Sequence, residues 1–173
     1  GETLITGIGQ GFMTASPLQL ALATAAIANK GQLLIPQVMM HSQSKNGNLF
    51  EEQNLKSNQI PIKDINNWEL IIEAMKQTVY GKFGTAKRLN NKLKYSLAGK
   101  TGTAQVFGLD PEEEYIAENI QEKLRDHALF TGFAPIEDPQ VAIAIIFENA
   151  GRGSSKTTPL AKQTLHENFI CLF

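Results

Sequence analysis

The sequence predicts an α+β (α/β) domain in which an antiparallel sheet is flanked by helices. Two apolar segments, His127–Ala134 and Val141–Phe147, are separated by a short turn that contains Pro135 and Pro139. So short a connection predicts an antiparallel pair, because parallel neighbours need a crossover of a dozen or more residues. The segment Val141–Phe147 is apolar without alternation, which is typical of a strand covered by helices on both faces. The 173 residues of the chain suffice for one domain with a hydrophobic core.

The clearest helix signal lies between Ser16 and Gly31. Ser16 is a good cap, Pro17 suits the first helical position, and Gln19 completes a capping box. Gly31 suits the left-handed residue that commonly ends a helix. We therefore expect a helix over Pro17–Lys30. Because this segment is apolar nearly all round, we also expect it to be mostly buried.

Two longer helices are predicted further along the chain. The first has Asn66 as its cap and Glu69 at the third position. It carries apolar residues at the spacing of one buried face, namely Trp68, Ile71, Ile72, Met75 and Val79. The second has Thr158 as its cap and Pro159 at its first position, and it runs to the C-terminus.

Weaker patterns fill the remaining segments. A strand is expected over Gln32–Met40, a short helix over Thr85–Leu89, and a helix that begins in the acidic segment Pro111–Glu114. Tyr95–Phe107 is expected to form a strand, and glycines within a strand indicate that backbone or ligand approaches closely.

The predicted strand order leaves an apolar strand at the edge of the sheet. The strand around Lys100 should pair with the strand around Leu129, so Val141–Phe147 lies at the far side. An exposed apolar edge strand is prone to aggregation. We therefore expect a further strand to pair with it, contributed by chain upstream of Gly1.

Composition excludes several classes of protein. Sixteen Lys and Arg against seventeen Asp and Glu give no basic surface for nucleic acid. The single cysteine, Cys171, excludes an intramolecular disulfide, and the three histidines lack metal-ligand spacing. The start of the chain has no signal-peptide pattern, and no stretch is apolar enough to span a membrane. The expectation is a cytoplasmic protein, or one whose targeting segment lies upstream.

Five segments together resemble one enzyme family. Lys100–Thr103 reads K-T-G-T, Gly9–Gly11 reads G-Q-G, and Ser16–Ala21 reads S-P-L-Q-L-A. Arg125–Phe130 reads R-D-H-A-L-F, and Gly132–Pro135 reads G-F-A-P. In this order they resemble the class B penicillin-binding proteins, and the acidic insertion after Phe107 makes the elongation type, the penicillin-binding protein 2 group, the best match. The resemblance covers nearly the whole chain.

The resemblance implies roles for four residues on the Lys100 strand. Lys100 would add positive charge beside a serine of the site and help to attract a substrate carboxylate. Thr101 and Thr103 lie two apart, hence on one face, and their hydroxyls would bind that carboxylate. The backbone N–H of Thr103 would be one oxyanion donor. Gly102 would let substrate backbone lie against the strand.

The family also implies what the chain works with and where. Its fold would be the C-terminal half of the penicillin-binding-protein transpeptidase or serine β-lactamase-like fold, with residues 1–173 a partial domain. Ligands would be the D-Ala-D-Ala stem peptide of peptidoglycan and β-lactams, with no cofactor, metal or nucleic acid. Partners would be the N-terminal half of the same protein and proteins of the cell-elongation complex. The location would be the periplasmic face of the bacterial inner membrane.

The family's nucleophile motif is not recognisable in this chain. The one S-x-x-K match, Ser42–Lys45, shares Lys45 with the one S-x-N match, Ser44–Asn46, so the two cannot form opposite walls of a site. Both fall in a predicted loop. We interpret both as chance, expect the nucleophile-bearing half, pedestal domain and membrane anchor upstream, and predict that the chain alone is inactive.

Several alternatives stay open from the sequence. The chain could derive from a division-type septal transpeptidase, from a serine β-lactamase-like hydrolase, or from a split gene that encodes a non-catalytic binding module. Lys100 could be a solvated strand lysine. His127 is interpreted as a hydrogen-bonded structural residue, paired with Asp126, rather than as a catalytic base.

Overall fold

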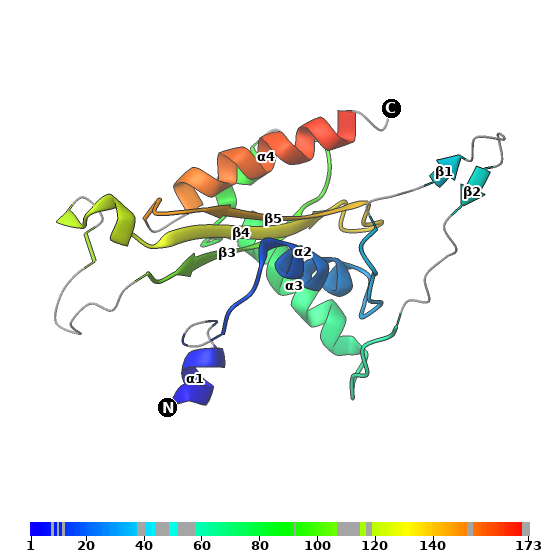
Figure 1. The fold of residues 1–173 in the computed structure, drawn as a ribbon, viewed down its shortest axis with the longest axis horizontal. Coiled ribbons are helices and arrows are strands. Elements are labelled where there is room, and N and C mark those ends of the chain that lie inside the picture. The colour runs from blue at the N-terminus through cyan, green and yellow to red at the C-terminus, as the bar shows by residue number, and fades with distance from the viewer. Residues whose placement is uncertain are drawn as a thin grey trace.

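A computed structural model describes residues 1–7, 9, 11, 13–37, 41–43, 49–51, 58–91, 93–106, 115–116, 119–151 and 154–170. Its centre is an antiparallel sheet of three strands, β3 (Ala98–Ala104), β4 (His127–Ala134) and β5 (Val141–Phe147), in the order β3-β4-β5. Helix α4 (Ser154–Ile170) covers one face, and helices α2 (Pro17–Ala28) and α3 (Asn66–Tyr80) lie on the other (Figure 1). The predicted α+β class is confirmed.

The hydrophobic core has one cluster on each face of the sheet. On the α4 side, Phe130 and Leu97 pack with Ala161 and Leu165 of the helix. On the other side, Phe133 of β4 belongs to the cluster that includes residues of α2 and α3. Helix α4 contacts β5 from one side of the sheet and helix α2 contacts it from the other, so the expected covering of β5 on both faces is present.

Helix α2 begins as predicted, but it is not buried all round. The Ser16 hydroxyl accepts from the Gln19 N–H at 3.2 Å and the Gln19 side chain accepts from the Ser16 N–H at 2.8 Å, which completes the capping box. The buried residues lie in the C-terminal half, whereas Leu18 is 57% exposed. The helix packs on β4, β5 and α3 through one side only, so the other side remains uncovered by the described residues.

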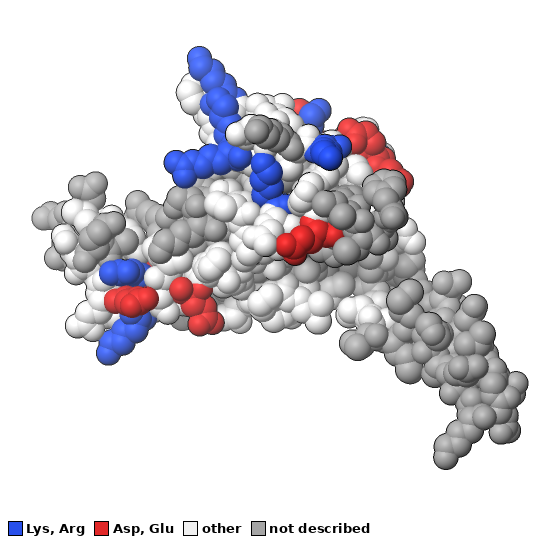
Figure 2. All heavy atoms as spheres, turned by 90° about the horizontal axis from the view of Figure 1, so that it is seen from above, with Lys and Arg blue, Asp and Glu red and all other residues white. Residues whose placement is uncertain are grey.

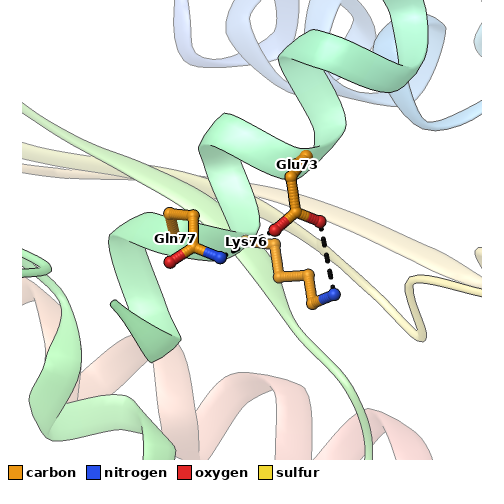
Figure 3. A network of polar contacts seen from close by, with 3 residues as sticks. All are labelled: Glu73, Lys76 and Gln77. Carbon is orange, nitrogen blue, oxygen red and sulfur yellow. Dashed lines mark hydrogen bonds and ion pairs between the residues drawn. The ribbon is translucent and has the colours of Figure 1, made fainter. Parts of the chain in front are cut away.

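Helix α3 has the predicted extent, with a different cap. Ile65 occupies the cap position in a helical conformation, and the Asp64 carboxylate accepts from the Asn66 N–H at 2.9 Å. Asn66 is therefore the first helical residue rather than the cap. Further along, Glu73 accepts from Gln77 at 2.7 Å and from Lys76 at 3.2 Å on the exposed face (Figure 3).

The C-terminal helix starts a turn earlier than predicted. Helix α4 begins at Ser154, so Pro159 lies inside the helix rather than at its first position. Thr157 and Thr158 are fully or almost fully buried. Tertiary packing at these threonines outweighs the local cap-and-proline signal that predicted a later start.

The shorter predictions had mixed outcomes. The expected helix over 85–89 is a 3-10 turn, η1 (Lys87–Asn90). Of the helix expected after residue 111, the described part includes the 3-10 turn η3 (Glu122–Leu124) and no α-helix, while 107–114 and 117–118 lie outside the described residues. The strand expected over Gln32–Met40 is wrong for 32–37, because 33–37 form no strand and Gln32 makes an isolated bridge with Gln59; residues 38–40 lie outside the described residues.

Three short elements lie outside this core. Helix α1 (Glu2–Gly7) precedes α2, and β1 (His41–Gln43) pairs antiparallel with β2 (Leu49–Glu51). Figure 1 shows β1 and β2 at the end of an arm, away from the three-stranded sheet. Among the described helices, none has the length and apolar character needed to cross a membrane.

Candidate functional site

The four motif residues lie on β3, at one edge of the sheet. Lys100 is opposite Thr131, Thr101 opposite Phe130, and Thr103 opposite Ala128 on β4. No described strand pairs with the other side of β3. Every second residue of β3 therefore directs its backbone N–H and C=O away from β4.

The side chains of the motif alternate between the two faces of the sheet. Ala98 packs with Phe133 in the cluster shared with α2 and α3, so Lys100 and Gly102 belong to that face. Thr101 and Thr103 belong to the face of Phe130 and α4. The two threonines therefore share a face, as expected. Lys100 belongs to the opposite face, and its ammonium reaches the backbone of Thr101 at the open edge of the sheet.

Lys100 is exposed and has no carboxylate partner among the described residues. Its Nζ donates to the Thr101 carbonyl at 2.6 Å. The two ion pairs of the described chain are Lys30–Glu69 and Lys76–Glu73, both remote in sequence from β3. The charge of Lys100 is thus available to an anion that approaches this edge.

The Thr101 hydroxyl is held by a residue that the sequence did not single out. Thr85 Oγ1 lies 2.7 Å from Thr101 Oγ1, and either hydroxyl can donate. Thr85 lies between α3 and η1, sixteen positions before Thr101. No spacing rule for a helix or strand relates these positions, so the sequence carried no signal for this contact.

The glycines of β3 have different surroundings. A Cβ at Gly99 would lie 2.5 Å from the Phe130 ring and 2.9 Å from the Thr131 carbonyl oxygen. A Cβ at Gly102 would meet only Leu129 Cβ at 3.4 Å, an ordinary contact. Packing therefore requires glycine at position 99, whereas at position 102 the fold itself leaves room for a side chain.

Residues around the start of β4 contact the chain that follows β3 and the turn that follows β5. Asp126 is buried, and its carboxylate accepts from the Val106 N–H at 3.4 Å. The Asp126 backbone N–H donates to the Tyr115 hydroxyl oxygen at 2.9 Å. His127 Nδ1 accepts from the Asn149 N–H at 2.9 Å. His127 is hydrogen-bonded, as expected, but its partner is the Asn149 backbone rather than Asp126.

Two hollows of the described surface lie beside the residues that lead into β3. One, of about 380 Å³, is lined by Lys94, Tyr95, Lys162 and His166 among others; a second, of about 430 Å³, is lined by Ser96 and Glu137 among others. Neither is lined by Lys100–Thr103. Figure 2 shows Lys and Arg mainly toward the top of its view, with others at the left end beside Asp or Glu.

Two titratable groups near these hollows have shifted pKa values. Burial, followed by the neighbouring Tyr80, raises the pKa of the Tyr95 hydroxyl. A hydrogen bond from the Ser96 hydroxyl lowers the pKa of the Glu137 carboxyl, assisted by a backbone bond and by the charge of Lys76. Within the described chain, no group of three or more metal-ligating side chains is present.

The S-x-x-K match does not adopt the arrangement of a helix-borne nucleophile. Ser42 lies in β1, opposite Phe50 of β2, so the prediction of a loop is wrong at this residue. Lys45 and Asn46 lie outside the described residues. Figure 1 shows β1 separated from β3, and the two strands belong to different sheets.

A comparison with protein families establishes the family to which the chain that carries this edge strand belongs. The model of the penicillin-binding protein transpeptidase domain matches residues 1–166. This chain belongs to the penicillin-binding protein transpeptidase family. The K-T-G-T segment of β3 is thereby identified as part of a transpeptidase domain, and the serine β-lactamase and binding-module alternatives are not favoured.

Similar proteins of this family are named peptidoglycan D,D-transpeptidases. The chain is 38% identical over 165 residues to the peptidoglycan D,D-transpeptidase MrdA of Haemophilus influenzae, covering 95% of this chain and 25% of that protein. It therefore spans about a quarter of the length of that curated relative.

Solved structures of penicillin-binding protein 2 have the same fold. The Pseudomonas aeruginosa protein, in complex with WCK 5153, is 38% identical with a TM-score of 0.76, over 95% of this chain and 32% of that one. The Helicobacter pylori protein, in complex with MreC, is 30% identical with a TM-score of 0.74, over 96% of this chain and 28% of that one. The resemblance to the penicillin-binding protein 2 group is confirmed.

Proposed function

We propose that this chain forms one wall of the active site of an elongation-type peptidoglycan D,D-transpeptidase. The observation that carries the proposal is the position of Lys100, Thr101 and Thr103 on an edge strand whose outer side has no described partner. A peptide that approaches this edge meets a cation, two hydroxyls and outward-directed backbone groups, which is what a stem peptide ending in a carboxylate requires.

The chemistry follows from these groups and from a serine that the rest of the protein supplies. The serine oxygen forms a bond to the penultimate D-Ala carbonyl carbon, the amide C–N bond breaks, and the terminal D-Ala leaves with a proton. An amine of a second stem peptide then attacks the acyl-enzyme and releases the serine. A β-lactam would acylate the same serine, with its ring amide in place of the D-Ala-D-Ala bond.

The position of each residue on β3 supports the role that we propose for it. The Lys100 ammonium attracts the carboxylate of the donor and stabilises negative charge at the edge. The Thr101 and Thr103 hydroxyls donate to that carboxylate. Residues two apart on a strand direct their backbone groups to the same side, so the Thr103 N–H points to the same side as the Thr101 carbonyl. The Thr101 carbonyl accepts from Lys100, and this supports the Thr103 N–H as an oxyanion donor beside that lysine.

The N-terminal half of the same protein is the partner that we propose for the uncovered surfaces. The outer edge of β5 and the exposed side chains Leu18 (57%) and Leu70 (69%) are suited to pack against further protein. We further propose residence on the periplasmic face of the inner membrane and assembly with the elongation complex. The complex of the similar Helicobacter pylori protein with MreC supports the latter.

Covalent labelling of the full-length protein with a fluorescent penicillin tests the function. We expect labelling of a serine outside this chain, and we expect Lys100→Ala to slow it by about 100-fold or more, because the preorganised charge that attracts the penicillin carboxylate is lost. Lys82→Ala, which removes another exposed lysine near Phe83, should label at the normal rate. Normal labelling of Lys100→Ala would contradict the proposal.

A further inference from the structure

Thr85 makes a direct contact with the side chain of a motif residue. Its Oγ1 lies 2.7 Å from Thr101 Oγ1, which is the ordinary length of a hydroxyl–hydroxyl hydrogen bond. Thr101 lies on β3, whereas Thr85 belongs to the turn between α3 and η1. The contact therefore couples the open edge of the sheet to a separate segment of the fold.

The position of Thr85 is fixed by the backbone on both sides. A Cβ at Gly84 would lie 2.3 Å from the Thr78 carbonyl oxygen, so this turn is pressed against the end of α3. The next residue, Ala86, is fully buried and donates its N–H to the Thr78 carbonyl at 3.0 Å. A short side chain on so constrained a backbone presents its hydroxyl at a defined place, even though Thr85 itself is exposed.

We propose that Thr85 is a positioning residue that orients the Thr101 hydroxyl toward the carboxylate of the acyl donor. The inference rests on the proposed function, in which Thr101 binds that carboxylate. A hydroxyl has one hydrogen to donate and two lone pairs to accept with. When Thr85 donates to Thr101, the Thr101 hydrogen is left for the carboxylate, and the lone pair facing Thr85 is occupied.

The resulting chain runs from the Thr85 hydroxyl to the Thr101 hydroxyl to the carboxylate. Its second bond is charge-assisted, hence stronger than a bond between neutral groups, and donation by Thr85 polarises the Thr101 O–H further. Without Thr85 the Thr101 hydroxyl rotates freely, and binding of the donor carboxylate must then restrict this rotation. The loss of one neutral hydrogen bond corresponds to about a 3- to 10-fold loss in rate.

The test compares two acyl donors on the full-length protein. The donors are thioesters that differ only at the terminus, one ending in a free carboxylate and the other in a carboxamide. We expect Thr85→Val to lower kcat/KM for the carboxylate donor by about 3- to 10-fold and to leave the carboxamide donor unchanged. Thr85→Ser, which retains the hydroxyl, should restore most of the rate.

A matched control removes a neighbouring hydroxyl that does not reach β3. The Thr78 hydroxyl donates only to the Ala74 carbonyl within α3, so Thr78→Val should behave as wild type on both donors. Thermal unfolding of all variants checks that Thr85→Val is folded.

The outcomes separate this inference from the proposed function. A normal rate of Thr85→Val on the carboxylate donor overturns the positioning role, and so does an equal loss on both donors, since that identifies a structural effect. Failure of Thr85→Ser to restore the rate overturns it as well. If wild type forms no acyl-enzyme with either donor, the proposed function fails, and this inference fails with it.

Discussion

At the scale of single residues, Ser96 links the chain entering β3 to the turn after β4. Its hydroxyl donates to the Glu137 carboxylate and accepts from the Ile136 N–H at 2.7 Å. The bond from Ser96 is the main reason that the pKa of Glu137 is lowered. A lowered pKa in the folded state stabilises the fold above the carboxyl's unfolded pKa, and this contribution disappears as pH falls through the folded pKa.

We therefore predict that Ser96→Ala raises the pKa of Glu137 toward its ordinary value. Because the ionised carboxylate is what Ser96 favours, the variant should lose stability relative to wild type at neutral pH and approach wild type in acid. Carboxyl NMR titration measures the pKa directly. Glu73, whose pKa is lowered by Gln77 and Lys76 on α3, serves as an internal control and should not move. An unchanged Glu137 titration would contradict the assignment.

The sequence predicted the motif residues but not their partners. Lys100, Thr101, Gly102 and Thr103 could be recognised because they are contiguous and recur as a pattern. Thr85 could not, because its contact depends on how the turn after α3 folds back to β3, and neighbouring Gly84 only indicates that a turn is present. Contacts between distant segments leave no periodicity in a single sequence.

At the scale of elements, the two glycines of β3 separate folding from function. Gly99→Ala places a methyl group 2.5 Å from the Phe130 ring, so we predict a loss of about 1–3 kcal/mol in the free energy of unfolding. Gly102→Ala has room against Leu129 and should unfold within about 0.5 kcal/mol of wild type. Urea unfolding of the full-length protein measures both.

The same pair distinguishes a binding edge from an ordinary strand. If donor peptide lies along β3, Gly102→Ala should slow acylation by penicillin although its fold is intact. Normal acylation of a stable Gly102→Ala protein would show that the donor does not approach position 102 closely.

For elements with local sequence signals, the start of the element was predicted better than the burial of its residues. The α2 start follows from the Ser16–Gln19 capping box, which involves only neighbours in sequence. The degree of burial of α2 depends on whether protein packs against residues such as Leu18, and the early start of α4 depends on the packing around Thr157. In both cases the packing partners are not neighbours in sequence. Both predictions were wrong for this reason.

At the scale of the whole molecule, the sheet is open on both sides of its described strands. The outer side of β3 is the edge that we assign to the substrate, and the outer side of β5 is the edge that we assign to the N-terminal half. The two edges differ in character, because β3 carries the motif residues while β5 is apolar throughout. An apolar edge is suited to permanent pairing within a protein and a polar one to reversible binding.

This assignment predicts different amide protection for the two outer strands. In the full-length protein, the amide hydrogens of β5 should exchange as slowly as those of β4, because strands protect β5 on both sides. The outward-directed amide hydrogens of β3 should exchange faster, and their exchange should slow down after acylation by penicillin. In the 173-residue chain alone, outward amides of β5 should lose their protection, and association through this edge should increase with concentration. Hydrogen exchange read by mass spectrometry and NMR measures these rates. Fast exchange of β5 in the full-length protein would contradict the assignment, since it would mean that the apolar edge stays open when the rest of the protein is present.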